Sequence, residues 1–177
     1  MDPEEAGKLE DESRYQSVSK EELLEHIQEG DKVADIGSGT GFFTDDISEI
    51  AGEVYAVDFQ EQMHDYYREK GLPRNVSTLT SKASDIELED LDVVISIFSL
   101  HEIDLDKALQ RFSKLLNQNG KLVAFDWSAN GSGDKNPPLE KRLDADSATR
   151  KISNYFEKVD GTERNNTFKV VAEKPVP

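Results

Sequence analysis

The stretch Val33-Ala34-Asp35-Ile36-Gly37-Ser38-Gly39-Thr40-Gly41 decides the fold of this chain. It begins in a short β-rich run, Lys32–Ile36, and apolar residues at a helical spacing follow the last glycine. Three alternating glycines let the backbone turn tightly and let a ligand lie against it. We therefore predict a strand, a ligand-binding glycine loop and a helix whose free N–H groups face that loop.

Strands and helices alternate outward from this loop as far as residue 127. The sequence patterns predict further strands at 53–57, 76–79, 92–98 and 121–126, and helices at 20–30, 42–51, 60–70 and 105–116, the last of them ended by Gly120. This alternation is typical of a parallel sheet with helices on both faces. A helix at 146–154 and two closely spaced strands at 156–159 and 167–173 predict a final antiparallel hairpin.

The length of 177 residues suits a single domain. Residues 1–17 are polar and rich in charge, so we expect a flexible acidic N-terminal segment, followed by one domain at 18–177. No apolar run approaches the ~20 residues that a membrane span needs, and the acidic N-terminus does not resemble a secretory signal. A cytoplasmic location is therefore the expectation.

The chain contains no cysteine, which excludes disulfides, thiolate metal sites and cysteine nucleophiles. Its three histidines are scattered, and no metal triad is apparent, so no metal is expected.

The charge is strongly acidic, with 37 Asp and Glu against 21 Lys and Arg and a net charge of −16. Such a field repels phosphate backbones, so nucleic acid is not an expected partner at ordinary salt. The excess of acids could serve a cationic partner, or it could form a solvated shell suited to molar salt. Because the acids are spread along the whole chain, we favour the high-salt interpretation. Lysine outnumbers arginine, which fits extreme halophiles poorly.

An acid also ends the second predicted strand, where Asp58 lies 21 residues after Gly37. A carboxylate at this place can accept hydrogen bonds from both hydroxyls of a ribose. The loop reads G-x-G-x-G rather than the G-x-G-x-x-G of dinucleotide sites, so the ligand need not carry a phosphate. A nucleoside with a zwitterionic amino-acid tail, its amino group near an acid such as Asp35, fits this description.

Five segments in order resemble the motifs of class I S-adenosylmethionine-dependent methyltransferases. They are residues 33–44; 56–58 with Met63; 83–86; 92–103; and 120–126. The sequence is most similar to the ubiquinone/menaquinone-biosynthesis type (methyltransferase type 11). The resemblance implies a Rossmann-like, doubly wound α/β fold with a seven-stranded, mostly parallel sheet. It also implies S-adenosylmethionine as methyl donor and S-adenosylhomocysteine as product.

The resemblance assigns donor contacts to Asp35, Gly37, Ser38, Gly39, Thr40, Gly41, Asp58, Phe59, Met63, Ser84, Asp85, Ile86, Phe98 and Ser99. Among these, Asp58 would bind the ribose and Asp85 the adenine amino group. Simpler interpretations remain for several: Asp35 could shield the loop, and Asp85 could be a solvated loop acid. Phe59, Met63, Phe98 and Ser99 could simply belong to the core.

His101 follows the fourth strand, where the family places groups near the transferred methyl. It is the candidate catalytic residue, because a histidine can take a proton from the attacking nucleophile. It could instead only orient the loop, since alignment of the two reactants can supply most of the acceleration. Glu102 and Asp126 are weaker candidates.

The motifs favour a methyltransferase that acts on a small molecule, because the loops are short and no extra domain grips a macromolecule. No Asn/Asp-Pro-Pro-Tyr/Phe follows the fourth strand, which disfavours amino-methylation of a DNA base. Two alternatives stay open. One is methylation of protein or RNA in a halophile, and the other is a binding module that has lost catalysis. A nicotinamide-dependent dehydrogenase is more distant, because the glycine spacing is wrong.

Overall fold

The computed structural model describes residues 3–133 and 137–177. Its strands are β1 Lys32–Ile36, β2 Glu53–Asp58, β3 Val76–Thr80, β4 Leu91–Ile97, β5 Leu116–Trp127, β6 Phe156–Glu163 and β7 Thr167–Pro175. Its α-helices are α1 Pro3–Leu9, α2 Lys20–Leu24, α3 Phe42–Ser48, α4 Glu61–Lys70, α5 Leu105–Leu115 and α6 Ala145–Ile152. Short 3-10 helices are η1 Glu12–Gln16, η2 Ala83–Asp85, η3 Leu100–Glu102 and η4 Leu139–Lys141.

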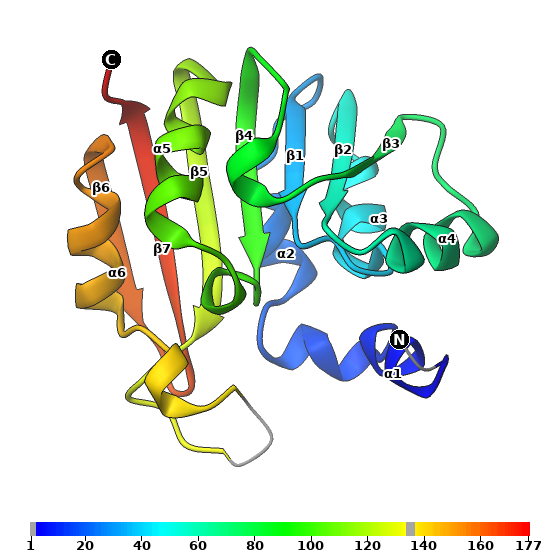
Figure 1. Cartoon of the computed structure of the whole chain (residues 1–177), viewed down its shortest axis with the longest axis horizontal. Helices are drawn as coiled ribbons and strands as arrows, with labels where there is room; N and C mark the ends of the chain where they lie inside the picture. The colour runs from blue at the N-terminus through cyan, green and yellow to red at the C-terminus, as the bar shows by residue number, and fades with distance from the viewer. Residues whose placement is uncertain (1–2, 134–136) are drawn as a thin grey trace.

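All seven strands form one sheet in the order β3-β2-β1-β4-β5-β7-β6 (Figure 1). The strands from β3 to β5 in this order pair in parallel, whereas β7 pairs antiparallel with both β5 and β6. The predicted α/β class, with a doubly wound, mostly parallel sheet and an antiparallel C-terminal hairpin, is confirmed.

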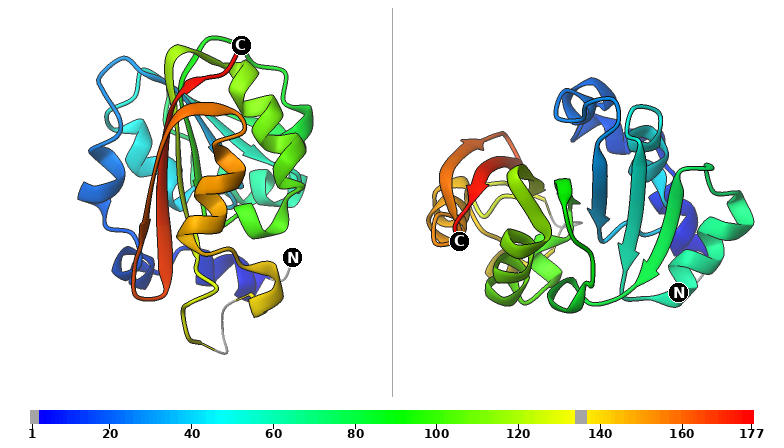
Figure 2. Two further views of the ribbon diagram at one scale, coloured as in Figure 1. Left: turned by 90° about the vertical axis from the view of Figure 1, so that its left-hand side faces the viewer. Right: turned by 90° about the horizontal axis from the view of Figure 1, so that it is seen from above.

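Two apolar layers cover the faces of the sheet, and Figure 2 shows helices on both sides of it. On one face, α5 and α6 bury Phe112 and Ile152 against the sheet. On the other face, Leu23 of α2, Ile47 of α3 and Tyr67 of α4 pack against the other sides of the same strands. Strands β1 and β4 are buried almost throughout, because side chains on both of their faces are covered.

Polar caps start several of the predicted helices. The Ser19 hydroxyl accepts a hydrogen bond from the Glu22 N–H at 3.1 Å, as the Ser-x-x-Glu pattern at the start of α2 suggests. In the same way, the Asp144 carboxylate accepts from the Ser147 N–H at 2.7 Å and starts α6.

One local prediction was wrong. Strand β5 begins at Leu116 rather than at residue 121, because Leu116 already pairs with Leu91 of β4 ahead of a register shift. In the N-terminal segment, which was predicted to be flexible, Pro3–Leu9 and Glu12–Gln16 are helical. The proposed division into residues 1–17 and 18–177 stays a prediction.

The parallel strands all end at the same edge of the sheet. In Figure 1 this is the lower edge, and α1 lies beneath it together with the segment that follows β5. The carboxyl edge of a parallel sheet is the usual place for a ligand. Among the described residues, no helix is long and apolar enough to cross a membrane.

Candidate active site

A cavity of about 880 Å³ opens at the carboxyl edge of the sheet. Ten of the predicted site residues line it: Gly37, Ser38, Gly39, Asp58, Phe59, Met63, Ser84, Phe98, Ser99 and His101. The other five predicted residues do not: Asp35, Thr40, Gly41, Asp85 and Ile86. Further lining residues come from the N-terminal segment (Leu9 and Arg14) and from the end of β5 and beyond (Trp127, Pro137, Pro138 and Lys141).

The glycine loop between β1 and α3 has no room for side chains at two positions. A Cβ on Gly37 would lie 2.5 Å from the Ser99 Cβ, and one on Gly41 would lie 2.3 Å from the Tyr67 ring. Both glycines also have positive φ, +71° and +85°. The loop therefore packs tightly against β4 and α4, which leaves its backbone open to the cavity.

Asp58 ends β2 beside this loop, and its carboxylate accepts two backbone hydrogen bonds. The Gly39 N–H donates to Oδ2 at 3.0 Å, and the Gln60 N–H donates to Oδ1 at 2.9 Å. Each oxygen keeps a second acceptor position. The carboxylate is thus oriented at the cavity wall and can still accept hydrogen bonds from a ligand.

The residues predicted to surround adenine differ in their placement. Phe59 is 60% exposed and forms part of the open cavity wall, whereas Met63 is buried beneath it. Ser84 also lines the cavity, and its hydroxyl donates to Asp85 Oδ1 at 2.9 Å. Ile86 is fully buried in the core, where its carbonyl accepts from Arg111, so it has no place in the cavity lining described here.

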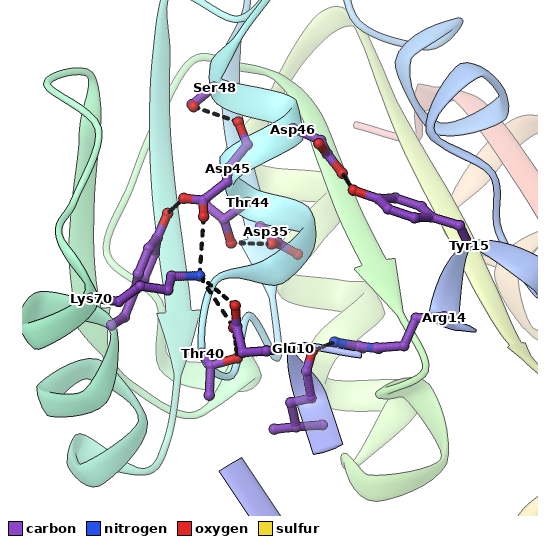
Figure 3. A network of polar contacts seen from close by, with 12 residues as sticks. Glu10, Arg14, Tyr15, Asp35, Thr40, Thr44, Asp45, Asp46, Ser48 and Lys70 are labelled. Carbon is purple, nitrogen blue, oxygen red and sulfur yellow. Dashed lines mark hydrogen bonds and ion pairs between the residues drawn. The ribbon is translucent and has the colours of Figure 1, made fainter. Parts of the chain in front are cut away.

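Asp35 and Thr40 lie outside the cavity lining, and both have partners within the protein. Asp35 is buried and accepts a hydrogen bond from the Thr44 hydroxyl at 2.6 Å (Figure 3). Burial raises the pKa of Asp35 to about 7, although the Thr44 hydrogen bond and the Arg14 charge act against this rise. The Thr40 hydroxyl donates to the Glu10 carboxylate of the N-terminal segment.

The turn after β4 carries the next two predicted residues. Phe98 has a positive φ of +57° and stacks on Trp127 with ring centroids 4.7 Å apart. The Ser99 hydroxyl donates to the Ile36 carbonyl at 2.8 Å and also contacts the Ser96 hydroxyl at 2.8 Å. These contacts join β1, β4 and β5 at the floor of the cavity.

His101 forms a pair with Asp126 at the end of the cavity beyond Phe98. The Asp126 carboxylate accepts from the His101 backbone N–H at 2.9 Å and from its ring Nδ1–H at 2.8 Å. A carboxylate can only accept, so Nδ1 carries the proton and Nε2 is left as the basic nitrogen. The nearest acid to Nε2 is Glu102, whose Oε1 lies 3.7 Å away.

A second cavity of about 160 Å³ adjoins the first at His101, Ile103 and Lys141. Its wall is mostly apolar, with contributions from Leu100, Leu105, Leu143 and Phe168. A cavity of this size and character can hold one small ring. The pair His101–Asp126 thus faces two connected spaces.

Arg14 and Trp127 line the cavity but were not among the predicted site residues, and Asp126 was predicted only as a weaker candidate. Asp126 carried a usable signal, because it ends a strand directly before the carboxyl edge, as Asp58 does. Arg14 carried none, because its place at the cavity depends on how a distant segment packs. Within the described residues, no group of three or more His, Asp or Glu could hold a metal ion.

Several polar groups at the site can still form hydrogen bonds with a nucleoside ligand. Ser38 lines the cavity, and its hydroxyl oxygen is buried without a hydrogen-bond partner among the described residues. The loop glycines leave the backbone bare, and Asp58 keeps free acceptor positions. This fits a ligand that lies along the loop and presents hydroxyl groups to an acid.

A doubly wound sheet with a glycine loop after β1 and an acid after β2 is an arrangement that class I S-adenosylmethionine-dependent methyltransferases share with other nucleotide-binding α/β folds. The chain belongs to the methyltransferase domain family of type 11, which matches residues 34–124, about half of its length.

Named relatives agree with this family. The ubiquinone/menaquinone biosynthesis C-methyltransferase UbiE of Pasteurella multocida is 33% identical over 112 residues, covering 58% of this chain and 42% of that protein. The UbiE protein of Vibrio vulnificus is 31% identical over 109 residues, with shares of 56% and 42%. The chain therefore matches about two fifths of the length of these curated relatives.

Solved structures share the fold. A SAM-dependent methyltransferase from Aquifex aeolicus is 28% identical, with a TM-score of 0.82 and 97% of this chain and 98% of that chain covered. The PH0226 protein from Pyrococcus horikoshii is 21% identical with a TM-score of 0.74, covering 92% and 90%, and it supports the fold alone.

Proposed function

We propose that the enzyme transfers the methyl group of S-adenosylmethionine to a small-molecule acceptor, with His101 as the general base. The observation that carries this proposal is the hydrogen-bonded pair His101–Asp126, whose histidine lines the same cavity as the glycine loop. One continuous cavity gives both the donor and the acceptor access to the same histidine.

The donor end of the site consists of the loop 37–41 and Asp58. Asp58 would accept the ribose hydroxyls, and the Ser38 hydroxyl would bond to the ligand that covers it. The predicted partner of the donor's amino group, Asp35, would act through the loop, because it lies behind it. When bound, the donor supplies a methyl group on a positively charged sulfur.

The protein's own part in the transfer is alignment and proton removal. The acceptor's nucleophilic atom forms a bond to the methyl carbon while the carbon–sulfur bond breaks, and S-adenosylhomocysteine is the product. The proton lost by the acceptor goes to His101 Nε2, and Asp126 stabilises the resulting positive charge through Nδ1. Alignment of the two reactants in one cavity can supply much of the remaining acceleration.

A small-molecule acceptor is supported by the relatives and by the shape of the site. The named relatives carry out C-methylation in quinone biosynthesis, and the second cavity beside His101 has room for a single ring. Two alternatives remain. The acceptor could be protein or RNA, or the chain could bind the donor without transferring its methyl group. The cytoplasmic location expected from the sequence stays a prediction.

The test is a screen of small hydroxylated and carbon-acid ring compounds with methyl-labelled S-adenosylmethionine. With an accepted compound, His101→Ala is expected to lower turnover about 10²–10⁴-fold with donor affinity nearly unchanged. Asp126→Asn should also lower turnover, because an amide no longer selects the Nδ1–H tautomer. His26→Gln, which changes a histidine outside the cavity lining, is the matched control.

Three results would contradict the proposal. Label found only in protein or RNA would favour a macromolecular acceptor. Donor binding without transfer to any compound would favour a silent binding module. Full turnover of His101→Ala, with weaker donor binding or a lower melting temperature, would assign the histidine a structural role.

A further inference from the structure

The N-terminal segment lies against the glycine loop and α3, as Figure 3 shows. The Glu10 carboxylate accepts from the Thr40 hydroxyl and from Lys70 Nζ, the latter at 3.1 and 3.2 Å. Further along the segment, the Tyr15 hydroxyl donates to Asp46 Oδ2 at 2.6 Å. Contacts at both positions hold the residues between 10 and 15 in place over the loop.

Arg14 lies in this held stretch and lines the cavity. Its guanidinium carbon lies 5.3 Å from the Phe42 ring centroid and 4.6 Å from that of Phe43, and its Nη1 donates to the Leu9 carbonyl at 2.8 Å. No other hydrogen bond of the guanidinium occurs among the side chains described, those of residues 6–133 and 137–177. A guanidinium has five N–H donors, so most of those on Arg14 are unused.

Arg14 is also held near the glycine loop through its contact with Leu9. Its hydrogen-bond partner Leu9 lies over Gly39, 3.5 Å from where a Cβ on that glycine would be. The other cations in the lining are Lys82 before η2 and Lys141 in η4. In a chain of net charge −16, a half-buried cation at this place is an unusual feature.

Arg14 forms no ion pair with any acid whose side chain the structure describes. Asp35 is near enough to act on it electrostatically, but the Asp35 carboxyl is bonded to Thr44 and buried. Glu10 also acts on Arg14, yet its carboxylate is engaged by Thr40 and Lys70. Unused donors, a positive charge and a place at the cavity wall together describe a binding site for a carboxylate.

We propose that Arg14 binds the carboxylate of the donor's amino-acid tail. The inference rests on the proposed donor site, because it requires the donor to lie along the loop 37–41. Arg14 lies outside the family match at residues 34–124, so the match assigns it no role. The N-terminal segment would then form part of the donor site and contribute to selectivity for ligands with an intact amino-acid tail.

The test compares the dissociation constants of two ligands for the wild-type protein and one variant, measured by isothermal titration calorimetry. The ligands are S-adenosylhomocysteine and its decarboxylated form, which keeps the adenosine, the thioether and the amine. The variant is Arg14→Met, which retains apolar contact with Phe42 and Phe43. The dissociation constant of S-adenosylhomocysteine should rise about 10- to 100-fold in the variant, and that of the decarboxylated ligand less than about threefold.

Arg74→Met, at an exposed arginine outside the cavity lining, is the matched control and should change neither affinity. Arg14→Lys keeps the charge and should recover part of the loss. An equal loss for both ligands in Arg14→Met, or no loss, would overturn the proposal.

A second test uses only the wild-type protein, so it does not depend on whether the variant folds. It should bind S-adenosylhomocysteine about 10- to 100-fold more tightly than the decarboxylated ligand. Equal affinity would overturn the role of Arg14. Failure of the wild type to bind either ligand would instead refute the donor site, a result distinct from the failure of this inference.

Discussion

At the scale of single residues, Asp35 is the most perturbed carboxyl near the site. It lies behind the glycine loop, and burial raises its pKa to about 7. An acid whose pKa is higher in the folded than in the unfolded protein binds extra protons on folding between the two values. The folded state is therefore favoured at the acid end of this window, and the contribution is lost as the pH rises through about 7.

Asp35→Asn isolates this effect, because asparagine keeps an acceptor for the Thr44 hydroxyl but cannot ionise. The free energy of unfolding of the wild type, minus that of the variant, should fall as the pH rises from about 4 to about 7, and stay level outside this range. Urea unfolding at constant ionic strength measures it. Asp160→Asn, at an exposed acid, is the control. A difference that does not change with pH would contradict the assignment.

Single residues also show what a sequence can and cannot predict about a site. The loop glycines and Asp58 could be predicted because strand, loop and acid are close in sequence and have a characteristic spacing. Asp35 was predicted to lie near the donor's amino group; it is buried and outside the cavity lining, and its role toward the donor stays a prediction. The contribution of Arg14 could not be predicted, because it depends on packing of a segment that has no sequence pattern of its own.

At the scale of elements, the contact between α3 and α4 depends on Gly41. The first turn of α3 meets the Tyr67 ring of α4, and the Tyr67 hydroxyl donates to Asp45 Oδ1 at 2.6 Å. A side chain at Gly41 would push these helices apart, and it would also strain a backbone with a φ of +85°. The glycine therefore sets the distance between two helices as well as the shape of the loop.

Gly41→Ala and Gly30→Ala separate these two effects, because both glycines have a φ near +85° but a Cβ on Gly30 would meet no atom within 4 Å. Gly30→Ala should lower the free energy of unfolding by about 1–2 kcal/mol through backbone strain alone. Gly41→Ala should lower the free energy of unfolding by about 1–3 kcal/mol more than Gly30→Ala does, because its Cβ also clashes with the Tyr67 ring. Urea unfolding of both variants provides the measurement. Equal losses would show that Tyr67 moves aside at no cost.

The order of the elements could be predicted from the sequence, but some of their ends could not. Every strand of the sheet was predicted at about its observed place, and the signal was clearest for the central strand β4, which is buried on both faces and gives a continuous apolar run. The start of β5 was misplaced because Gly120 appeared to end the preceding helix. The strand begins earlier, at Leu116, because Leu116 pairs with Leu91 of β4, and such pairing between distant segments leaves no local signal.

At the scale of the whole molecule, the main feature is the excess of acids. The net charge is −16, although several surface acids form ion pairs, such as Glu22 with Arg164 and Glu173 with Lys158. Surface pairs of this kind contribute little to stability. Repulsion among the remaining acids should therefore destabilise the fold at low salt.

The melting temperature should rise steadily from low salt to about 1 M KCl, because the Debye length then falls to about 3 Å. Differential scanning calorimetry without donor gives the measurement. Sodium chloride at equal ionic strength is the control for a specific effect of potassium. A flat or falling curve would contradict adaptation to high salt and would favour a cationic partner for the acidic surface.

Strand β7 has a consequence for how the protein is made. It follows β6 in the chain but lies between β5 and β6 in the sheet. While the chain leaves the ribosome, β6 therefore has no strand to pair with, and the free edge of β5 stays open until β7 has emerged. An open edge is a template for pairing with other chains. The nascent protein is thus most exposed to aggregation just before its last strand is released, and β7 closes the β5 edge and attaches β6 in a single step.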